Sequence, residues 1–210
     1  MTYDISKSGK QTLLQGRVLN LLVLSTLGLA TSFAPAVAIE FSKPKAVVEL
    51  FTSQGCSSCP PADAALKEMN EDGEFLGLAL HVDYWDQQGW KDTFAQAIFT
   101  QRQRYYIQAF GGRNMYTPQV IVNGEKDMVG SKAGTIKHEI SQAQHHQRSV
   151  GMRVTEQGGL LSVELPDATK REQAKLVLVG FDGQEEVHIK RGENRGKKVI
   201  YTHVVKEISV

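Results

Sequence analysis

The chain has 210 residues, a formal net charge of +1 and two cysteines. This length suits one ordinary domain, or one domain with a small addition. Basic and acidic residues nearly balance, so the composition gives no electrostatic basis for binding nucleic acid or an anionic membrane, and we expect neither as a partner.

The first 38 residues have the pattern of an export signal. Basic residues at Lys7, Lys10 and Arg17 lead into a leucine-rich apolar stretch over 18–30, and Ala36-Val37-Ala38 supplies the small residues of a signal-peptidase site. The apolar stretch is about a dozen residues, fewer than the roughly 20 that a membrane-spanning helix needs. We predict cleavage after Ala38, export to the periplasm or the medium, and no stable membrane span afterwards. An uncleaved anchor is the alternative.

Residues 45–147 predict an α/β domain. In chain order, the pattern predicts a strand at 46–51, a helix at 60–69, a strand at 76–82, a helix from 92 or 93 to 109, strands at 119–122 and 126–129, and a helix at 135–146. Asn123-Gly124 is a strong hairpin signal between the last two strands. Strands that alternate with helices and then close on a hairpin favour a mixed sheet flanked by helices.

The pattern changes after residue 147. Short apolar segments, separated by turns rich in glycine, proline and aspartate, indicate strands at 152–154, 160–165, 174–181, 187–189 and 199–205. We therefore expect a small all-β appendage over 148–210. A basic run from Lys190 to Lys198 lies in one of its turns, and we interpret it as a solvated loop.

Both cysteines lie in one C-x-x-C motif, Cys56–Cys59, between the first predicted strand and helix. We expect the first sulfur to lie beside free helix N–H groups, whose dipole favours a thiolate. Cys56 is then the nucleophile, and Cys59, a turn further in, is the resolving thiol. An inert disulfide is the alternative, but closing so short a loop removes little chain entropy.

Two motifs resemble the thioredoxin-like superfamily: this C-x-x-C after the first strand, and Thr117-Pro118 before the hairpin. More narrowly, residues 49–63, 81–86, 116–119 and 191–194 are similar to an exported bacterial family of unknown function with a thioredoxin-like fold. The resemblance runs from about residue 45 to the C-terminus. It implies a thioredoxin-like mixed sheet and a cis Pro118 packed against the dithiol. The Thr117 backbone would then be free to pair with an extended substrate.

The chain departs from ordinary thioredoxins near the motif. The intervening dipeptide is Ser57-Ser58, and Gly55 precedes the first cysteine where thioredoxins have tryptophan. Glu49 lies seven residues before the first cysteine, whereas the buried acid of thioredoxins lies six before it. Glu49 either serves the second thiol or is an ordinary residue on the polar side of a strand, and we favour the second interpretation.

An aromatic and acidic loop follows the second predicted strand. It contains Asp83, Trp85 and Trp90, at the sheet edge where ligands bind in open α/β sheets. With Thr117 and Pro118, these residues are candidates for substrate contact, because indoles supply apolar area for a peptide and a carboxylate can move protons. The alternative is that the indoles pack the loop and the acid is solvated or caps the helix.

These observations favour an exported thiol–disulfide oxidoreductase that needs no cofactor and acts on exported proteins carrying thiols or disulfides. Its redox direction is left open. The alternative is a metallochaperone that holds copper(I) on Cys56 and Cys59, with His81 as a further ligand, because two thiolates suit that ion. A structural or adaptor role with an idle dithiol is the third possibility.

Overall fold

The structure, a computed structural model, describes residues 2–4, 37–38, 44–143, 153–157, 160–164 and 176–209. The chain divides into two compact units, one formed by Lys43–Arg148 with Gln173–Val210 and the other by Met1–Ser42 with Ser149–Glu172. Apart from 2–4 and 37–38, the predicted signal peptide lies outside the described residues. Within the ranges given above, no helix is both long enough and apolar enough to cross a membrane.

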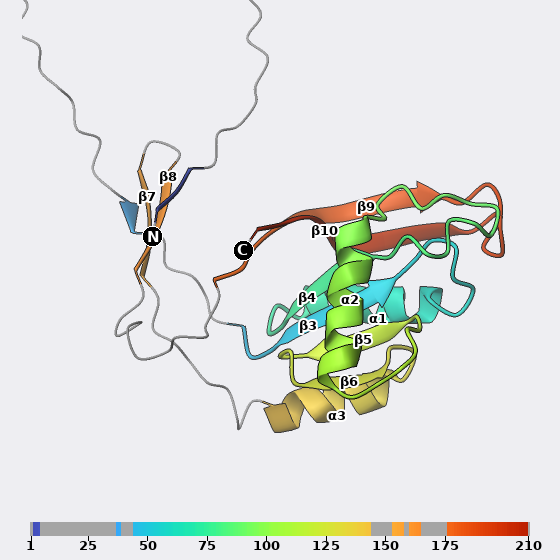
Figure 1. Ribbon diagram of the computed structural model, residues 1–210, viewed down its shortest axis with the longest axis horizontal. Coiled ribbons are helices and arrows are strands. Elements are labelled where there is room, and N and C mark those ends of the chain that lie inside the picture. Colours follow the sequence, from blue (N-terminus) through green and yellow to red (C-terminus); the bar gives the residue numbers. More distant parts are fainter. Residues whose placement is uncertain are drawn as a thin grey trace, which may run out of the picture. The chain divides into compact units, whose positions relative to one another are not determined.

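The larger unit is built on a six-stranded mixed sheet in the order β6-β5-β3-β4-β10-β9 (Figure 1). Its strands are β3 (Val47–Thr52), β4 (Leu76–His81), β5 (Gln119–Val122), β6 (Lys126–Val129), β9 (Leu178–His188) and β10 (Lys198–Ser209). Strand β3 pairs in parallel with β4 and antiparallel with β5. The predicted α/β class, a mixed sheet flanked by helices, is confirmed.

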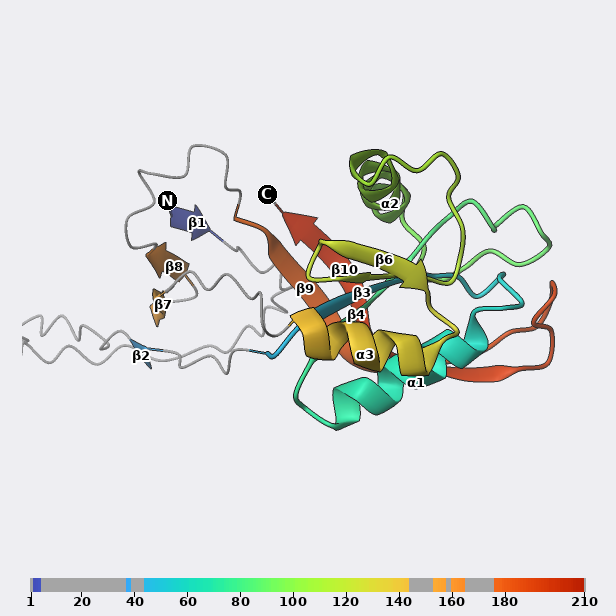
Figure 2. The same cartoon turned by 90° about the horizontal axis from the view of Figure 1, so that it is seen from below.

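Three helices cover the two faces of this sheet: α1 (Pro60–Glu71), α2 (Ala97–Ala109) and α3 (Ala133–Ala143). Figure 2 shows α1 and α3 on one face and α2 on the other. Successive side chains of a strand point to opposite faces, so Leu50 packs with Leu66 of α1, whereas Phe51 packs with Phe99 of α2. Strand β3 is therefore buried on both sides, and the C-x-x-C motif follows directly at its end.

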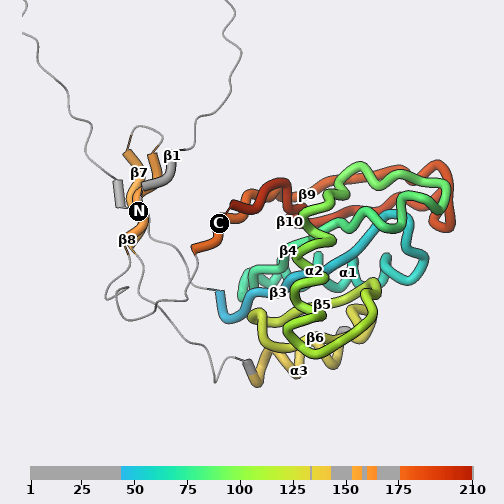
Figure 3. The backbone as a smooth tube through the Cα atoms, viewed as in Figure 1, coloured from blue at the N-terminus to red at the C-terminus, as the bar shows by residue number. Residues whose placement is uncertain are grey.

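The strands that the structure describes after residue 147 are divided between two sheets. Strands β9 and β10 form a long antiparallel hairpin, and β10 joins the main sheet through the parallel pair Val204 and Ala79 (Figure 3). Tyr201 and Val204 are buried in a cluster with Ile189, and Trp90 and Phe94 of the loop after β4 pack against this cluster. Local apolar patterning indicates strands but not the sheet edge that they join.

The smaller unit holds a four-stranded antiparallel sheet in the order β1-β8-β7-β2. Its strands are β1 (Thr2–Asp4), β2 (Val37–Ala38), β7 (Arg153–Gln157) and β8 (Leu160–Glu164). The prediction of β-structure around 152–165 is confirmed for β7 and β8.

Candidate functional site at the dithiol

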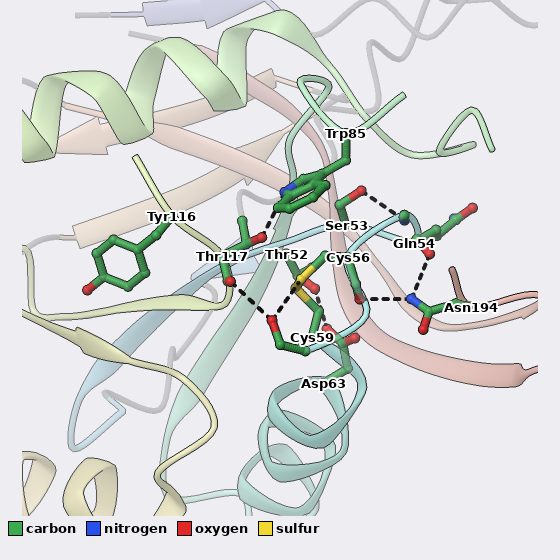
Figure 4. Close-up of a disulfide and its surroundings, with 12 residues drawn as sticks. Thr52, Ser53, Gln54, Cys56, Cys59, Asp63, Trp85, Tyr116, Thr117 and Asn194 are labelled. Atoms are coloured by element: carbon green, nitrogen blue, oxygen red, sulfur yellow. Dashed lines mark hydrogen bonds between the residues drawn. A yellow bond between two sulfur atoms is a disulfide. The ribbon is translucent and has the colours of Figure 1, made fainter. Parts of the chain in front are cut away.

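Cys56 and Cys59 form a disulfide between the end of β3 and the start of α1 (Figure 4). Both residues are buried, with 1% and 0% of their surface exposed. Cys59 is the N-cap residue of α1, and its N–H donates to the Cys56 carbonyl at 3.2 Å. The predicted order of strand, dithiol and helix is present, but in this oxidised form both sulfurs lie below the surface.

The start of α1 differs from the expected array of free N–H groups. Pro60 and Pro61 are its first two residues and have no N–H, while Ala62 and Asp63 donate to the Cys59 carbonyl at 2.8 and 3.1 Å. What lies beside the first sulfur is instead the Ser58 hydroxyl, whose Oγ is 3.4 Å from Cys56 Sγ. In the oxidised form this hydroxyl donates to the Thr117 carbonyl at 3.4 Å. On reduction it could donate instead to a Cys56 thiolate, and it would then add to the stabilisation by the helix dipole.

Asp63 is a buried acid one helical turn after Cys59. Thr52, the last residue of β3, donates its hydroxyl to Asp63 Oδ1 at 2.7 Å, and Oδ2 has no hydrogen-bond partner among the described residues. Burial raises the pKa of Asp63 to about 7, outweighing the hydrogen bond from Thr52 and the charge of His81, which lower it. A carboxyl group that titrates near neutral pH therefore lies at the base of the dithiol helix.

Sequence reasoning did not single out Asp63, although a signal was available. The residue shares the buried stripe of α1 with Ala62, Leu66 and Met69. An aspartate at helical spacing within an apolar stripe is unusual, because an isolated buried carboxylate is costly.

Glu49 fits neither of its two predicted roles. It lies on the α2 face of β3, where its carboxylate accepts hydrogen bonds from Arg102 at 2.8 Å and from the Tyr106 hydroxyl at 2.6 Å. Thr52 and Leu50 point instead toward α1. Glu49 therefore belongs to a buried ion pair that anchors α2 to the sheet, away from the dithiol.

A second buried pair supports the turn before the dithiol. His81 is fully buried, and its Nδ1 lies 2.8 Å from Asp92 Oδ2, which also accepts the N–H of Gln54 at 2.7 Å. Burial alone would raise the pKa of Asp92, but His81 and the N–H groups of Gln54 and Phe94 hold it below its usual range. Asp92 thus fixes the backbone two residues before Cys56.

The copper(I) alternative stays a prediction. His81 Nδ1 is occupied by Asp92, while Nε2 has no hydrogen-bond partner in the part of the chain described. The same part of the chain contains no group of three or more histidine, cysteine, aspartate or glutamate side chains placed to hold a metal ion.

The predicted contact residues divide into two groups. Trp85 lies beside the dithiol in Figure 4, and its Nε1 donates to Thr117 Oγ1 at 2.8 Å. The Thr117-Pro118 bond is cis, as the resemblance implied, but the Thr117 carbonyl is not free because Ser58 Oγ lies 3.4 Å from it. Trp85 and Thr117 therefore lie close to Cys56, as Figure 4 shows.

The other two predicted contact residues have structural partners. Trp90 donates its Nε1 to Gln54 Oε1 at 2.8 Å, so it supports the turn before the dithiol. Asp83 accepts the Thr100 hydroxyl at 2.6 Å and thereby ties its loop to α2. These two residues therefore make the loop contacts that the alternative describes, and substrate contact by them stays a prediction.

Asn194, in the turn between β9 and β10, reaches back to the dithiol loop. Its buried Nδ2 donates to the carbonyls of Gln54 at 2.9 Å and Cys56 at 2.8 Å, and its Oδ1 accepts from Lys197 at 2.8 Å (Figure 4). The sequence predicts a solvated basic loop here, whereas Asn194 itself is buried. The signal in the sequence is the motif at 191–194, which is part of the family resemblance.

The chain matches a family model described as "Protein of unknown function (DUF1223)" over residues 47–210. No protein with a curated description matches it. Among solved structures, it is similar to the crystal structure of an Agrobacterium tumefaciens protein from a structural genomics consortium. That similarity has a TM-score of 0.68 at 34% identity and covers 81% of this chain and 73% of the other.

Proposed function

The chain belongs to the DUF1223 family of proteins of unknown function, and from its site we propose that it is an exported thiol–disulfide oxidoreductase with a thioredoxin-like arrangement of its dithiol. One observation carries the proposal: the only two cysteines form a disulfide at a helix start, with a buried acid of pKa about 7 one turn away. Perturbed acids of this kind concentrate at sites that move protons.

The proposed chemistry is thiol–disulfide exchange at Cys56. A substrate thiolate attacks Cys56 Sγ, the bond to Cys59 breaks, and Cys59 leaves as a thiolate while a mixed disulfide forms. A second substrate thiolate attacks the substrate sulfur of that mixed disulfide, and Cys56 leaves as a thiolate. Two electrons pass from the substrate to the dithiol, and the two protons of the substrate thiols pass to the cysteines or to solvent. Run in reverse, the dithiol reduces a substrate disulfide.

Asp63 offers a way for the deeply buried Cys59 to act as a leaving group. A thiolate on Cys59 would be poorly solvated, so its formation needs a nearby group that exchanges a proton with it. A carboxyl group with a pKa of about 7 is divided between its protonated and ionised forms at neutral pH. Asp63 can therefore give a proton to Cys59 when the disulfide opens and accept it when the disulfide closes.

Export is the second part of the proposal. It rests on the signal-peptide pattern of residues 1–38 and on the disulfide, because such bonds persist in oxidising compartments and are rare in the cytosol. The substrates would be exported proteins that carry thiols or disulfides.

A trapping experiment tests the proposal. Expressed with its own leader, Cys59→Ser should accumulate mixed disulfides with exported proteins on a non-reducing gel, because Cys56 can attack but no second thiol resolves the product. The matched control Cys56→Ser should trap far less, since the remaining thiol is Cys59, the N-cap residue of α1, to which we assign the resolving step. Equal trapping by both variants, or none by either, would count against Cys56 as the exchanging residue.

A further inference from the structure

A hollow between the C-terminal half of α2 and the loop toward β5 has no role in the function proposed above. Its volume is about 590 Å³. Its apolar part comes from Tyr84, Ile107 and Met115, and its polar part includes Arg104, Arg113 and Asn114. No carboxylate lines it.

Both guanidinium groups of the hollow are available to a ligand. Arg104 and Arg113 are exposed, and within the described ranges neither side chain makes an ion pair or a hydrogen bond. Arginine presents a planar fork of N–H donors that matches the two oxygens of a carboxylate. The apolar lining adds a surface for the methylene stem of an acidic side chain.

Two short series of contacts lead from residues that line the hollow toward the exchanging sulfur, Cys56 Sγ. Tyr84 precedes Trp85, whose indole donates to Thr117 Oγ1. Met115 lies two residues before Thr117, and Ser58 Oγ connects the Thr117 carbonyl to Cys56 Sγ through separations of 3.4 Å each. An extended chain advances roughly 3.3 Å per residue. Consider a substrate chain that runs along residues 113–117 and has its reacting cysteine at the dithiol. The substrate residue at the hollow is then two to four residues away from that cysteine.

Resting on the proposed oxidoreductase function, we propose that this hollow is a subsite for an acidic side chain of the substrate protein. It takes a glutamate or aspartate roughly two to four residues from the cysteine that exchanges with Cys56. Arg104 and Arg113 bind the carboxylate, and the apolar lining holds its stem. The subsite selects among exported thiol proteins without taking part in the exchange of sulfur.

Peptide thiols test the subsite with the oxidised full chain. Three peptides that differ only in glutamate, glutamine or lysine three residues from a single cysteine are compared by the rate at which they open the disulfide. The glutamate peptide should react roughly fivefold faster than the glutamine peptide, because one partly exposed ion pair stabilises the bound peptide by about that factor. The lysine peptide should be slowest. Arg104→Gln and Arg113→Gln should each reduce the ratio of the glutamate-peptide rate to the glutamine-peptide rate.

The matched control is Arg191→Gln. Arg191 is also exposed and lies three residues from Asn194, which contacts the dithiol loop, but it does not line the hollow. Loss of the glutamate preference in this variant would show that the preference comes from the long-range electrostatic field of the protein, and it would overturn the subsite. Equal rates for the three peptides with the unaltered chain would overturn it as well. Reduced glutathione should react at the same rate with all variants, and a dependence on both arginines would assign the hollow to small thiols instead. If no thiol opens the disulfide, the oxidoreductase proposal itself fails.

Discussion

At the scale of single residues, Asp63 connects the structure to the proposed chemistry most closely. Its carboxyl group is held by one hydrogen bond from Thr52, and the second oxygen is left without a partner in the described part of the chain. A carboxylate in such a place is poorly stabilised, so the protonated form is favoured to unusually high pH. The folded chain therefore keeps a proton on Asp63 to a higher pH than the unfolded chain does, and that has a measurable consequence for stability.

The first prediction concerns the pH dependence of unfolding. The pKa of Asp63 rises from an ordinary 3.8 to about 7 on folding, so the stabilisation of the folded state is complete below about pH 4 and is lost as the pH rises through 7. The asparagine in Asp63→Asn cannot ionise, so this variant should not lose stability as the pH rises. In the unaltered protein, the decrease in the free energy of unfolding amounts to roughly 4 kcal/mol at most. Urea unfolding of the oxidised protein at pH 5 and pH 8 measures the effect.

The control for this prediction is Asp72→Asn, which removes an exposed acid at the C-cap of the same helix. It should keep the fall in the free energy of unfolding between pH 5 and pH 8 that the unaltered protein shows. If Asp63→Asn keeps the same fall, then Asp63 does not titrate in this range and cannot be the proton carrier proposed for Cys59.

At the scale of secondary-structure elements, the β9–β10 hairpin does more than extend the sheet. Through Asn194, it satisfies two backbone carbonyls of the loop that carries the dithiol, those of Gln54 and Cys56. On the other side of the loop, Asp92 satisfies the Gln54 N–H. The loop before α1 is thus held by two segments distant in sequence, and these contacts fix the backbone at Gln54 and Cys56.

We predict that Asn194→Ala destabilises the protein by about 1–3 kcal/mol, because it leaves two buried carbonyls without their donor. Amide hydrogen exchange of residues 54–58 should also become faster, since the loop loses its tie to the hairpin. Glu193→Ala, at the exposed neighbouring position, should leave both quantities nearly unchanged. Equal effects of the two substitutions would show that the side chain of Asn194 does not hold the dithiol loop.

At the scale of the whole molecule, the sequence predicted what depends on local patterning. The strand at 46–51, the helix after the C-x-x-C, the strand at 76–82 and the hairpin at Asn123-Gly124 follow from apolar periodicity and turn chemistry, and the structure contains them. Strand β3 and helix α1 alone place the disulfide, so the centre of the candidate site was accessible from the sequence.

Features that depend on contacts between distant residues were not predictable in this way. Helix α2 begins at Ala97 rather than at 92 or 93, although Asp92 accepts the Phe94 N–H as an N-cap residue would. The same carboxylate also contacts His81 and the Gln54 N–H, which are distant in sequence. The place of β10 beside β4, and with it the role of Asn194, depends on pairing across more than a hundred residues. No local pattern specifies such a pairing.

The central claim is that Cys56 and Cys59 cycle between dithiol and disulfide, and a redox titration of the full chain against glutathione tests it most directly. Tryptophan fluorescence reports the state, because the indole of Trp85 lies beside the disulfide and bonds to Thr117, whereas Trp90 bonds to Gln54 (Figure 4). We predict one reversible two-electron transition, whose signal is lost in Trp85→Phe and kept in Trp90→Phe. A disulfide that glutathione cannot open at any ratio, or that does not re-form after reduction, would contradict the claim.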